Sequence, residues 1–196
     1  MTYVIAEPGS GEKSWYMACL DLEGRSCLVV GGGSVGLEKA RGLLDCGADV
    51  TVVAPAIRSE LRELPVELIE RPFDEADLEG RQLVIAATSD AAVNTEVFAA
   101  AERRRVFCNV ADVPELCSFI LPAVHREGPI TIAVSTGGAS PALAQWLRAR
   151  IAETIGPEHA RIADQLRGLR PWAKRNLPTY EDRRDYFQRL VERALG

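Results

Sequence analysis

A glycine-rich turn between an apolar run and an amphipathic segment is the feature that most constrains the fold of this chain. Gly31, Gly33 and Gly36 stand at the spacing G-x-G-x-x-G. Residues 26–31, SCLVVG, are apolar and β-prone, and residues 35–46 carry apolar side chains at helical intervals. A strand that turns through glycines into a helix is the context in which this spacing binds the phosphates of a dinucleotide.

Each glycine has its own geometric role in such a turn. Gly31 permits the tight turn, Gly33 lets the backbone approach a pyrophosphate, and Gly36 lets the helix pack closely on the strand. The helix start then supplies free N–H groups and a positive dipole. We therefore expect a dinucleotide to contact Gly31, Gly33, Ser34, Val35 and Gly36; a purely structural glycine turn is the alternative.

The end of the second predicted strand lacks one part of this fingerprint. An acid at that place normally binds the ribose 2′-OH, but residues 49–55, DVTVVAP, end in alanine and proline. Either the backbone of Pro55 and Ala56 holds the ribose, or Arg58 beyond them faces a 2′-phosphate. These residues leave NAD and NADP open.

Further strands are expected at residues 66–72, 83–89 and 106–112, and a helical pattern separates the last two. Continuous apolar strands that alternate with helices are typical of a parallel sheet covered on both faces. The sequence therefore predicts an α/β fold, with a Rossmann-type parallel sheet domain over residues 1–121.

The pattern changes after residue 121. Residues 118–125 and 129–135 read as two more strands, which would leave exposed edges and an apolar patch in a monomer. We therefore expect residues 122–155 to form a small β-rich dimerisation segment, and the chain to be a homodimer.

The last part of the chain reads as helical. A helix is expected over residues 141–155, with Ser140 as its N-cap. Residues 156–196 are expected to form a helical domain, with breaks at Pro171 and Pro178.

Composition excludes several classes of protein. The 196 residues carry a net charge of −5, which argues against a general nucleic-acid or membrane binder. No run approaches the roughly 18 apolar residues of a membrane span, and the N-terminus lacks the order of a secretory signal. The five cysteines form no CxxC pair, so we expect buried free thiols in a reducing cytoplasm and no metal site built from them.

Four segments together resemble the precorrin-2 dehydrogenase family, the NAD-dependent module of siroheme synthase. They are VVGGGSVGLEKARGLLDCGADVTVVAP, RPFDEADLEGRQLVIAATSD, VFCNVADVPELCSFILPAV and ITIAVSTGGASPALAQWLR. The resemblance covers nearly the whole chain and implies a Rossmann domain, a dimerisation segment and a helical domain. Because the chain ends at Gly196, we expect it to lack the methyltransferase domain of long siroheme synthases.

The resemblance also implies a reaction. Family members remove two electrons from precorrin-2 to give sirohydrochlorin, with NAD⁺ as hydride acceptor. Some also insert Fe²⁺ to give siroheme; whether this chain does so, and which modified haem ends its pathway, stays open. The alternative is a nucleotide-sensing Rossmann regulatory domain without catalysis, but such domains usually keep the acid after the second strand.

Several site residues follow from the fold and the resemblance. Asp112 is the expected catalytic residue, because it stands at a strand end and matches the family's key aspartate. There it can accept a proton and help guide Fe²⁺. The alternative is that its carboxylate only stabilises a turn. Asn109 and Val110 are expected to border the nicotinamide, and Ala87 and Thr88 to line the path of the cofactor.

Other polar residues are weaker candidates. Asp90 and Ser140 are expected to cap helices, whereas Ser135 and Thr136 are candidate contacts to substrate carboxylates. Residues 151–196 carry a net charge of +2, which suits a macrocycle with eight carboxylates. The candidate cations are Arg161, Arg167, Arg170, Lys174 and Arg175. The two histidines, His125 and His159, are expected to be structural.

Overall fold

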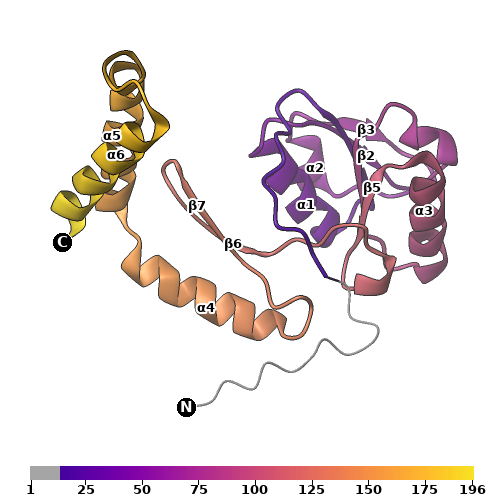
Figure 1. The fold of residues 1–196 in the computed structure, drawn as a ribbon. Coiled ribbons are helices and arrows are strands. Elements are labelled where there is room, and N and C mark those ends of the chain that lie inside the picture. The colour runs from indigo at the N-terminus through magenta and orange to yellow at the C-terminus, as the bar shows by residue number, and fades with distance from the viewer. Residues whose placement is uncertain (1–13) are drawn as a thin grey trace. The chain divides into compact units, whose positions relative to one another are not determined.

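A computed structural model describes residues 14–196 of the chain (Figure 1). The chain divides into two compact units, with the boundary between Leu121 and Pro122. The first unit contains a five-stranded parallel sheet in the order β3-β2-β1-β4-β5. Its strands are β1 (Ser26–Val30), β2 (Asp49–Val53), β3 (Glu67–Ile69), β4 (Leu83–Ala86) and β5 (Phe107–Val110).

Helices cover both faces of this sheet, as Figure 1 shows for α1 and α3. Because side chains alternate along a strand, successive residues of each strand enter different cores. Leu28 and Val84 pack with α3, whereas Val29 and Ile85 pack with α1. The helical elements are α1 (Ser34–Leu44), α2 (Ser59–Arg62), η1 (Glu75–Leu78), α3 (Ala91–Arg104) and η2 (Pro114–Leu116).

The strand register brings several loops to one edge of the sheet. Val30 lies opposite Val53 of β2 and Ala86 of β4, and Ala86 lies opposite Val110 of β5. The carboxyl ends of these four strands therefore meet. The connections diverge from β1, toward β2 on one side and β4 on the other, which is where ligands bind in open α/β sheets.

The predicted Rossmann-type sheet is confirmed, with shorter strands than the apolar runs suggest. A strand is expected over residues 83–89, but strand pairing stops at Ala86. Ala87 still donates its N–H to the Val30 carbonyl, whereas the polar residues Thr88 and Ser89 lie in the loop before α3.

The second unit begins with an antiparallel pair, β6 (Ala123–Glu127) and β7 (Ile130–Val134). The strand expected over residues 118–125 is therefore wrong before residue 123. Ser118 instead binds the edge of β5, because its N–H donates to the Cys108 carbonyl and its hydroxyl accepts from the Cys108 N–H. Phe119 and Ile120 are apolar because they pack against the cores of the first unit.

Three helices complete the second unit: α4 (Pro141–Thr154), α5 (Pro157–Asn176) and α6 (Tyr180–Leu195). The break expected at Pro171 is wrong, since α5 continues through it. Proline removes one helical hydrogen bond, but the next residue, Trp172, packs on Tyr186 of α6 with ring centroids 5.4 Å apart. Pro178 does lie between α5 and α6. The division of this unit near residue 155 stays a prediction.

None of the helices described over residues 14–196 is long and apolar enough to cross a membrane.

Candidate functional site

The glycine turn is held closely between two strand ends. The N–H of Gly31 donates to the Val53 carbonyl, and its φ of +130° lies in the region that favours glycine. A Cβ on Gly31 would collide with the Ala87 carbonyl, and one on Gly36 with the Gly31 carbonyl. Side chains at these two positions would thus displace backbone.

Gly33 differs from its neighbours because packing does not require it. Its backbone is extended, with φ −86° and ψ −167°, and a Cβ there would meet nothing within 4 Å. It occupies the N-cap position of α1, where no side chain caps the helix and no acid lies in the first turn. An open, uncapped helix start fits a phosphate group.

A cavity of about 530 Å³ opens above this turn at the carboxyl edge of the sheet. Five loops form its walls, one after each strand of the sheet, and many of the lining residues are glycines or small apolar residues. Its lining comprises Val30, Gly31, Gly32, Gly33, Ser34, Val35, Val53, Ala54, Pro55, Ala56, Pro72, Phe73, Ala87, Thr88, Ser89, Asp90, Val93, Ala111 and Asp112.

Most of the predicted cofactor residues lie on this cavity. The ones on its wall are Gly31, Gly33, Ser34, Val35, Pro55, Ala56, Ala87 and Thr88, together with the predicted catalytic Asp112. Gly36 lies below it, packed against the turn. Sequence reasoning missed Pro72 and Phe73. They follow β3, so the rule that placed the other strand ends at this edge could have found them.

The loop after β4 is fixed by its own hydrogen bonds. The Thr88 hydroxyl lies 2.9 Å from Asn94 Oδ1 and accepts from the Asp90 N–H at 3.1 Å. The Asp90 carboxylate caps α3, as predicted, by accepting from the N–H groups of Ala92 and Val93. The Asn94 amide also donates to the Thr88 carbonyl at 3.0 Å, so both the hydroxyl and the carbonyl of Thr88 are bonded within this loop.

Asn109 and Val110 do not line this cavity. The Asn109 amide donates to the Phe119 carbonyl at 3.0 Å, which ties β5 to the following loop. Val110 is 1% exposed and packs in the core against α3. Their expected contact with the nicotinamide stays a prediction.

Asp112 lies two residues beyond the end of β5, on the cavity wall. Its φ of +62° is left-handed, a region that non-glycine residues seldom adopt, although Asp is one of the more tolerant. Among residues 14–196 no hydrogen bond or ion pair reaches its carboxylate. Backbone held in such a conformation often marks a functional site.

The Arg58 side chain forms an ion pair with Glu60. Its Nη2 lies 2.6 Å from Glu60 Oε1 and its Nε 3.3 Å from Oε2. Hydrogen bonds from Arg58, then from the Glu60 N–H and the Ser59 hydroxyl, lower the pKa of Glu60 to about 2. Arg58 is not part of the cavity lining.

The candidate substrate residues of the second unit serve its local structure. The Ser135 hydroxyl accepts from the Gly137 N–H, and the Thr136 hydroxyl accepts from the Ser140 N–H. Ser140 caps α4 through the Leu143 N–H, as predicted.

Both histidines form hydrogen bonds within the second unit. His125 Nε2 lies 3.0 Å from the Ile155 carbonyl, and His159 Nδ1 accepts from the Gly156 N–H at the start of α5. Within residues 14–196 no group of three or more His, Cys, Asp or Glu side chains could hold a metal ion.

All five cysteines are free thiols, but the expectation that all are buried is wrong for Cys19, which is exposed in the segment before β1. Cys46 is only partly buried. Burial raises the pKa of Cys108 to about 12, so this thiol is held in its unreactive form.

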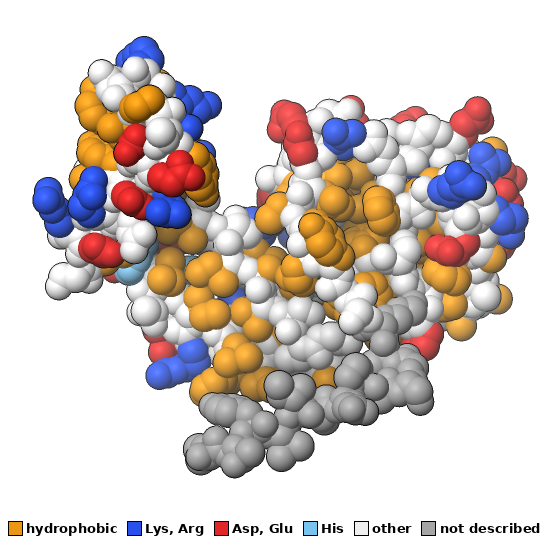
Figure 2. Space-filling model, in the orientation of Figure 1, with side chains coloured by type: hydrophobic (Ala, Val, Ile, Leu, Met, Phe, Trp, Pro, Cys, Tyr) orange, Lys and Arg blue, Asp and Glu red, His pale blue; other side chains and the backbone are white. Residues whose placement is uncertain are grey.

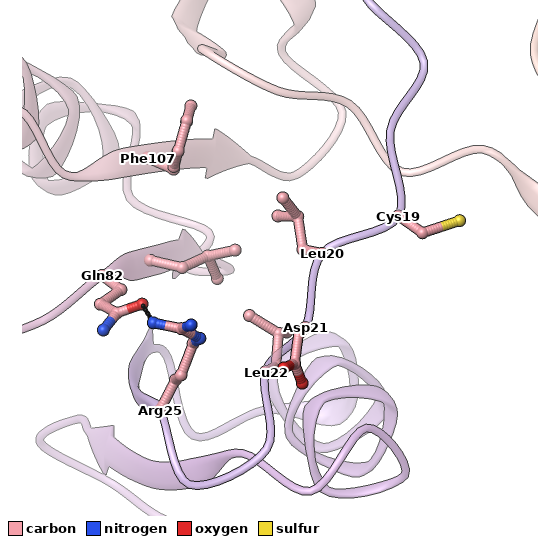
Figure 3. Close-up of a pocket in the computed structure, with 8 residues that line it drawn as sticks. Cys19, Leu20, Asp21, Leu22, Arg25, Gln82 and Phe107 are labelled. Atoms are coloured by element: carbon pink, nitrogen blue, oxygen red, sulfur yellow. Dashed lines mark hydrogen bonds between the residues drawn. The ribbon is translucent and has the colours of Figure 1, made fainter.

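A second, smaller hollow of about 230 Å³ lies at the opposite, amino edge of the sheet (Figure 3). Its lining includes Leu20, Leu22 and Phe107, and the hydrogen bond from Arg25 to Gln82 lies beside them. It lacks the glycine turn and the helix start of the larger cavity.

The parallel sheet, the glycine turn and the uncapped helix start define a dinucleotide-binding protein of the Rossmann class. Comparisons with known proteins agree. Residues 18–123 match the family described as putative NAD(P)-binding, and residues 127–154 match the family described as sirohaem biosynthesis protein central. The chain belongs to this NAD(P)-binding family, and its cofactor is a nicotinamide dinucleotide.

Relatives narrow the family further. The chain is 45% identical to a siroheme synthase of Thioalkalivibrio sulfidiphilus over 87% of this chain and 36% of that protein. It is 43% identical to a siroheme synthase of Pseudomonas paraeruginosa over 89% of this chain and 38% of that protein. The chain thus spans little more than a third of the length of these relatives.

A solved structure extends the likeness to the whole fold. The structure described as SirC, precorrin-2 dehydrogenase, is 27% identical, with a TM-score of 0.75 over 90% of this chain and 89% of that one. The resemblance inferred from the four sequence segments is confirmed.

Proposed function

We propose that the chain is an NAD-dependent precorrin-2 dehydrogenase that produces sirohydrochlorin in siroheme biosynthesis. The observation that carries the proposal is the cavity at the carboxyl edge, which brings together the glycine turn and Asp112. Among residues 14–196 the Asp112 carboxylate has no partner. The names of the relatives and of the matching structure supply the substrate.

The chain's own residues divide the work. The glycine turn and the start of α1 hold the pyrophosphate, and the backbone of Pro55 and Ala56 borders the adenosine ribose. NAD⁺ held there would supply the hydride acceptor. Asp112 accepts a proton that the substrate releases as it is oxidised. Precorrin-2 and NAD⁺ thereby give sirohydrochlorin, NADH and a proton.

The substrate's carboxylates need cations and hydroxyls. Arginine recognises carboxylates through paired N–H donors, and α5 exposes the five candidate cations named above. One of them, Arg167, lies 3.5 Å from Asp164 across one helical turn and would exchange this weak surface pair for a substrate carboxylate. Ser135 and Thr136 are the proposed hydroxyl contacts.

The second unit supports the proposed homodimer. A two-stranded hairpin is marginal by itself, and α4 buries only Ala144 among its described residues. Figure 2 shows apolar side chains gathered over β6, β7 and α4, where Leu143 is 48% and Trp146 60% exposed. Light scattering should give about twice the chain mass of 21.4 kDa; a monomer mass at micromolar concentration would contradict this assembly.

The deciding experiment is an anaerobic incubation of the protein with precorrin-2 and NAD⁺, followed by Fe²⁺. Formation of NADH together with the sirohydrochlorin spectrum supports the dehydrogenase. Cofactor binding without turnover supports the regulatory alternative. A further spectral change that requires both Fe²⁺ and the protein identifies iron insertion, in which the free Asp112 carboxylate is a suitable hard oxygen ligand.

A further inference from the structure

The segment after β2 is fastened to the glycine turn. The Arg58 N–H donates to the Gly32 carbonyl at 3.1 Å. Gly32 packs so closely on this segment that a Cβ there would collide with the Ala56 carbonyl. Arg58 is the first cation after β2 in the sequence. A single backbone hydrogen bond joins it to the glycine turn.

This position matters for the choice between the two nicotinamide dinucleotides. In Rossmann proteins the residues after the second strand meet the adenosine ribose, and an arginine there accommodates the 2′-phosphate of NADP. This chain has the arginine but no acid at the strand end itself, where Ala54, Pro55 and Ala56 line the cavity. Sequence alone would allow NADP.

The structure shows that Arg58 is occupied. Two N–H groups of its guanidinium donate to the Glu60 carboxylate, at 2.6 and 3.3 Å. The Ser59 hydroxyl donates to the same carboxylate at 3.0 Å. A 2′-phosphate would have to break this pair and would also approach the Glu60 charge.

The other arginines of residues 54–73, one in α2 and one in the loop after β3, also form ion pairs with carboxylates. Arg62 binds Glu70 through two hydrogen bonds of 2.8 Å each. Arg71, in the loop after β3, binds Asp77 at 2.6 and 2.9 Å. Each cation in residues 54–73 is thus matched by a carboxylate.

We infer that Glu60 makes the site select NAD⁺ over NADP⁺ by holding Arg58 in a two-pronged ion pair. The inference rests on the proposed nicotinamide-dependent function and names the residue that sets its cofactor preference. Glu60 acts through Arg58 and does not touch NAD⁺, so it is a positioning residue. Neither residue is needed to hold the pyrophosphate, which lies at the helix start.

The test is calorimetric titration of NAD⁺ and NADP⁺ into the wild-type protein and Glu60→Gln. Hydrogen bonds to charged groups change affinity by about tenfold or more. We therefore expect Glu60→Gln to lower the ratio of the NADP⁺ to the NAD⁺ dissociation constant by about tenfold. The gain should shrink as salt rises, because it comes from exposed charges.

Two further variants make the result specific. Glu70→Gln breaks the same kind of pair at Arg62 and should leave the ratio unchanged. Adding Arg58→Ala to Glu60→Gln should abolish the gain, because the freed guanidinium is then missing.

Three results would overturn the inference. They are a wild-type preference for NADP⁺, an unchanged ratio in Glu60→Gln, and an equal shift in Glu70→Gln. In each of these results the protein still binds a dinucleotide, so the proposed dehydrogenase function is not contradicted. Binding of neither dinucleotide by the folded wild-type protein would instead overturn both proposals.

Discussion

The two edges of the parallel sheet use the same strands but end in different chemistry. At the carboxyl edge, glycines and small apolar residues leave a cavity of about 530 Å³. Near the amino edge, Arg81 donates to the hydroxyls of Ser26 and Thr51, and Thr51 donates to Glu67. One edge keeps side chains away from the strand ends, whereas the other joins its strands through side chains.

This difference separates binding from stability. Polar side chains that satisfy one another add to stability but leave no donors for a ligand. A turn without Cβ atoms leaves backbone donors and space, which a phosphate can use. Substitutions at the carboxyl edge should therefore change cofactor binding or turnover, and substitutions at the amino edge should change the free energy of unfolding.

The largest expected effect is at Asp112. Asp112→Asn keeps the size and tolerates the left-handed backbone, but it loses the basicity. Turnover of precorrin-2 should fall by about 10²–10⁴-fold, the usual contribution of general acid–base catalysis. NAD⁺ affinity, measured by calorimetry, should change little.

Asp112→Ala provides a second variant, in which the side chain is removed but the left-handed backbone is less well tolerated. Near-normal turnover in both variants would show that Asp112 is only a turn residue.

The next effect is loss of NAD⁺ binding in Gly33→Asp. The new carboxylate would stand where the pyrophosphate is expected, and opposed like charges cost several kcal/mol, or about 10³-fold in affinity. The protein should still fold, because a Cβ at Gly33 meets nothing within 4 Å.

Gly42→Asp is the matched control for this variant. It introduces the same side chain into α1, at another position with open space, and NAD⁺ should bind as in the wild type. Wild-type affinity in Gly33→Asp would refute the assigned phosphate site.

Gly36 lies at the carboxyl edge, but Gly36→Ala should lower the free energy of unfolding. It is thus the expected exception to the separation of binding from stability. Its Cβ would overlap the Gly31 carbonyl, and overpacking of this kind costs about 1–3 kcal/mol. Chemical denaturation should show this loss. Gly42→Ala, which meets no neighbour in the same helix, should instead stabilise by about 0.5–1 kcal/mol.

The smallest expected effect is at the amino edge. Arg81→Met removes the donor shared by Ser26 and Thr51 and should lower the free energy of unfolding by about 1–2 kcal/mol. NAD⁺ affinity should not change. Arg25→Met, which removes one exposed hydrogen bond to Gln82, should have a smaller effect on stability. A loss of NAD⁺ binding in Arg81→Met would contradict the assignment of binding to the carboxyl edge and of stability to the amino edge.

Much of the first unit could be predicted because its signals are local. The glycine spacing, the five strand segments and the helix cap at Asp90 each depend on neighbouring residues, as does the cap at Ser140 in the second unit. The second unit was less predictable. There, α5 continues through Pro171 where packing on α6 supports it. At the end of the first unit, residues 118–121 resemble a strand, but Ser118 binds the edge of β5 instead.

By itself, the sequence determined the class of fold, the glycine turn between β1 and α1, and the family, because glycine spacing and apolar periodicity are properties of consecutive residues. Only the tertiary structure decided which residues meet at the cavity. It placed Phe73 beside the glycine turn, turned Asn109 toward the Phe119 carbonyl and paired Arg58 with Glu60. The physical reason is that strand order and side-chain direction arise from pairing and packing between segments distant in the chain.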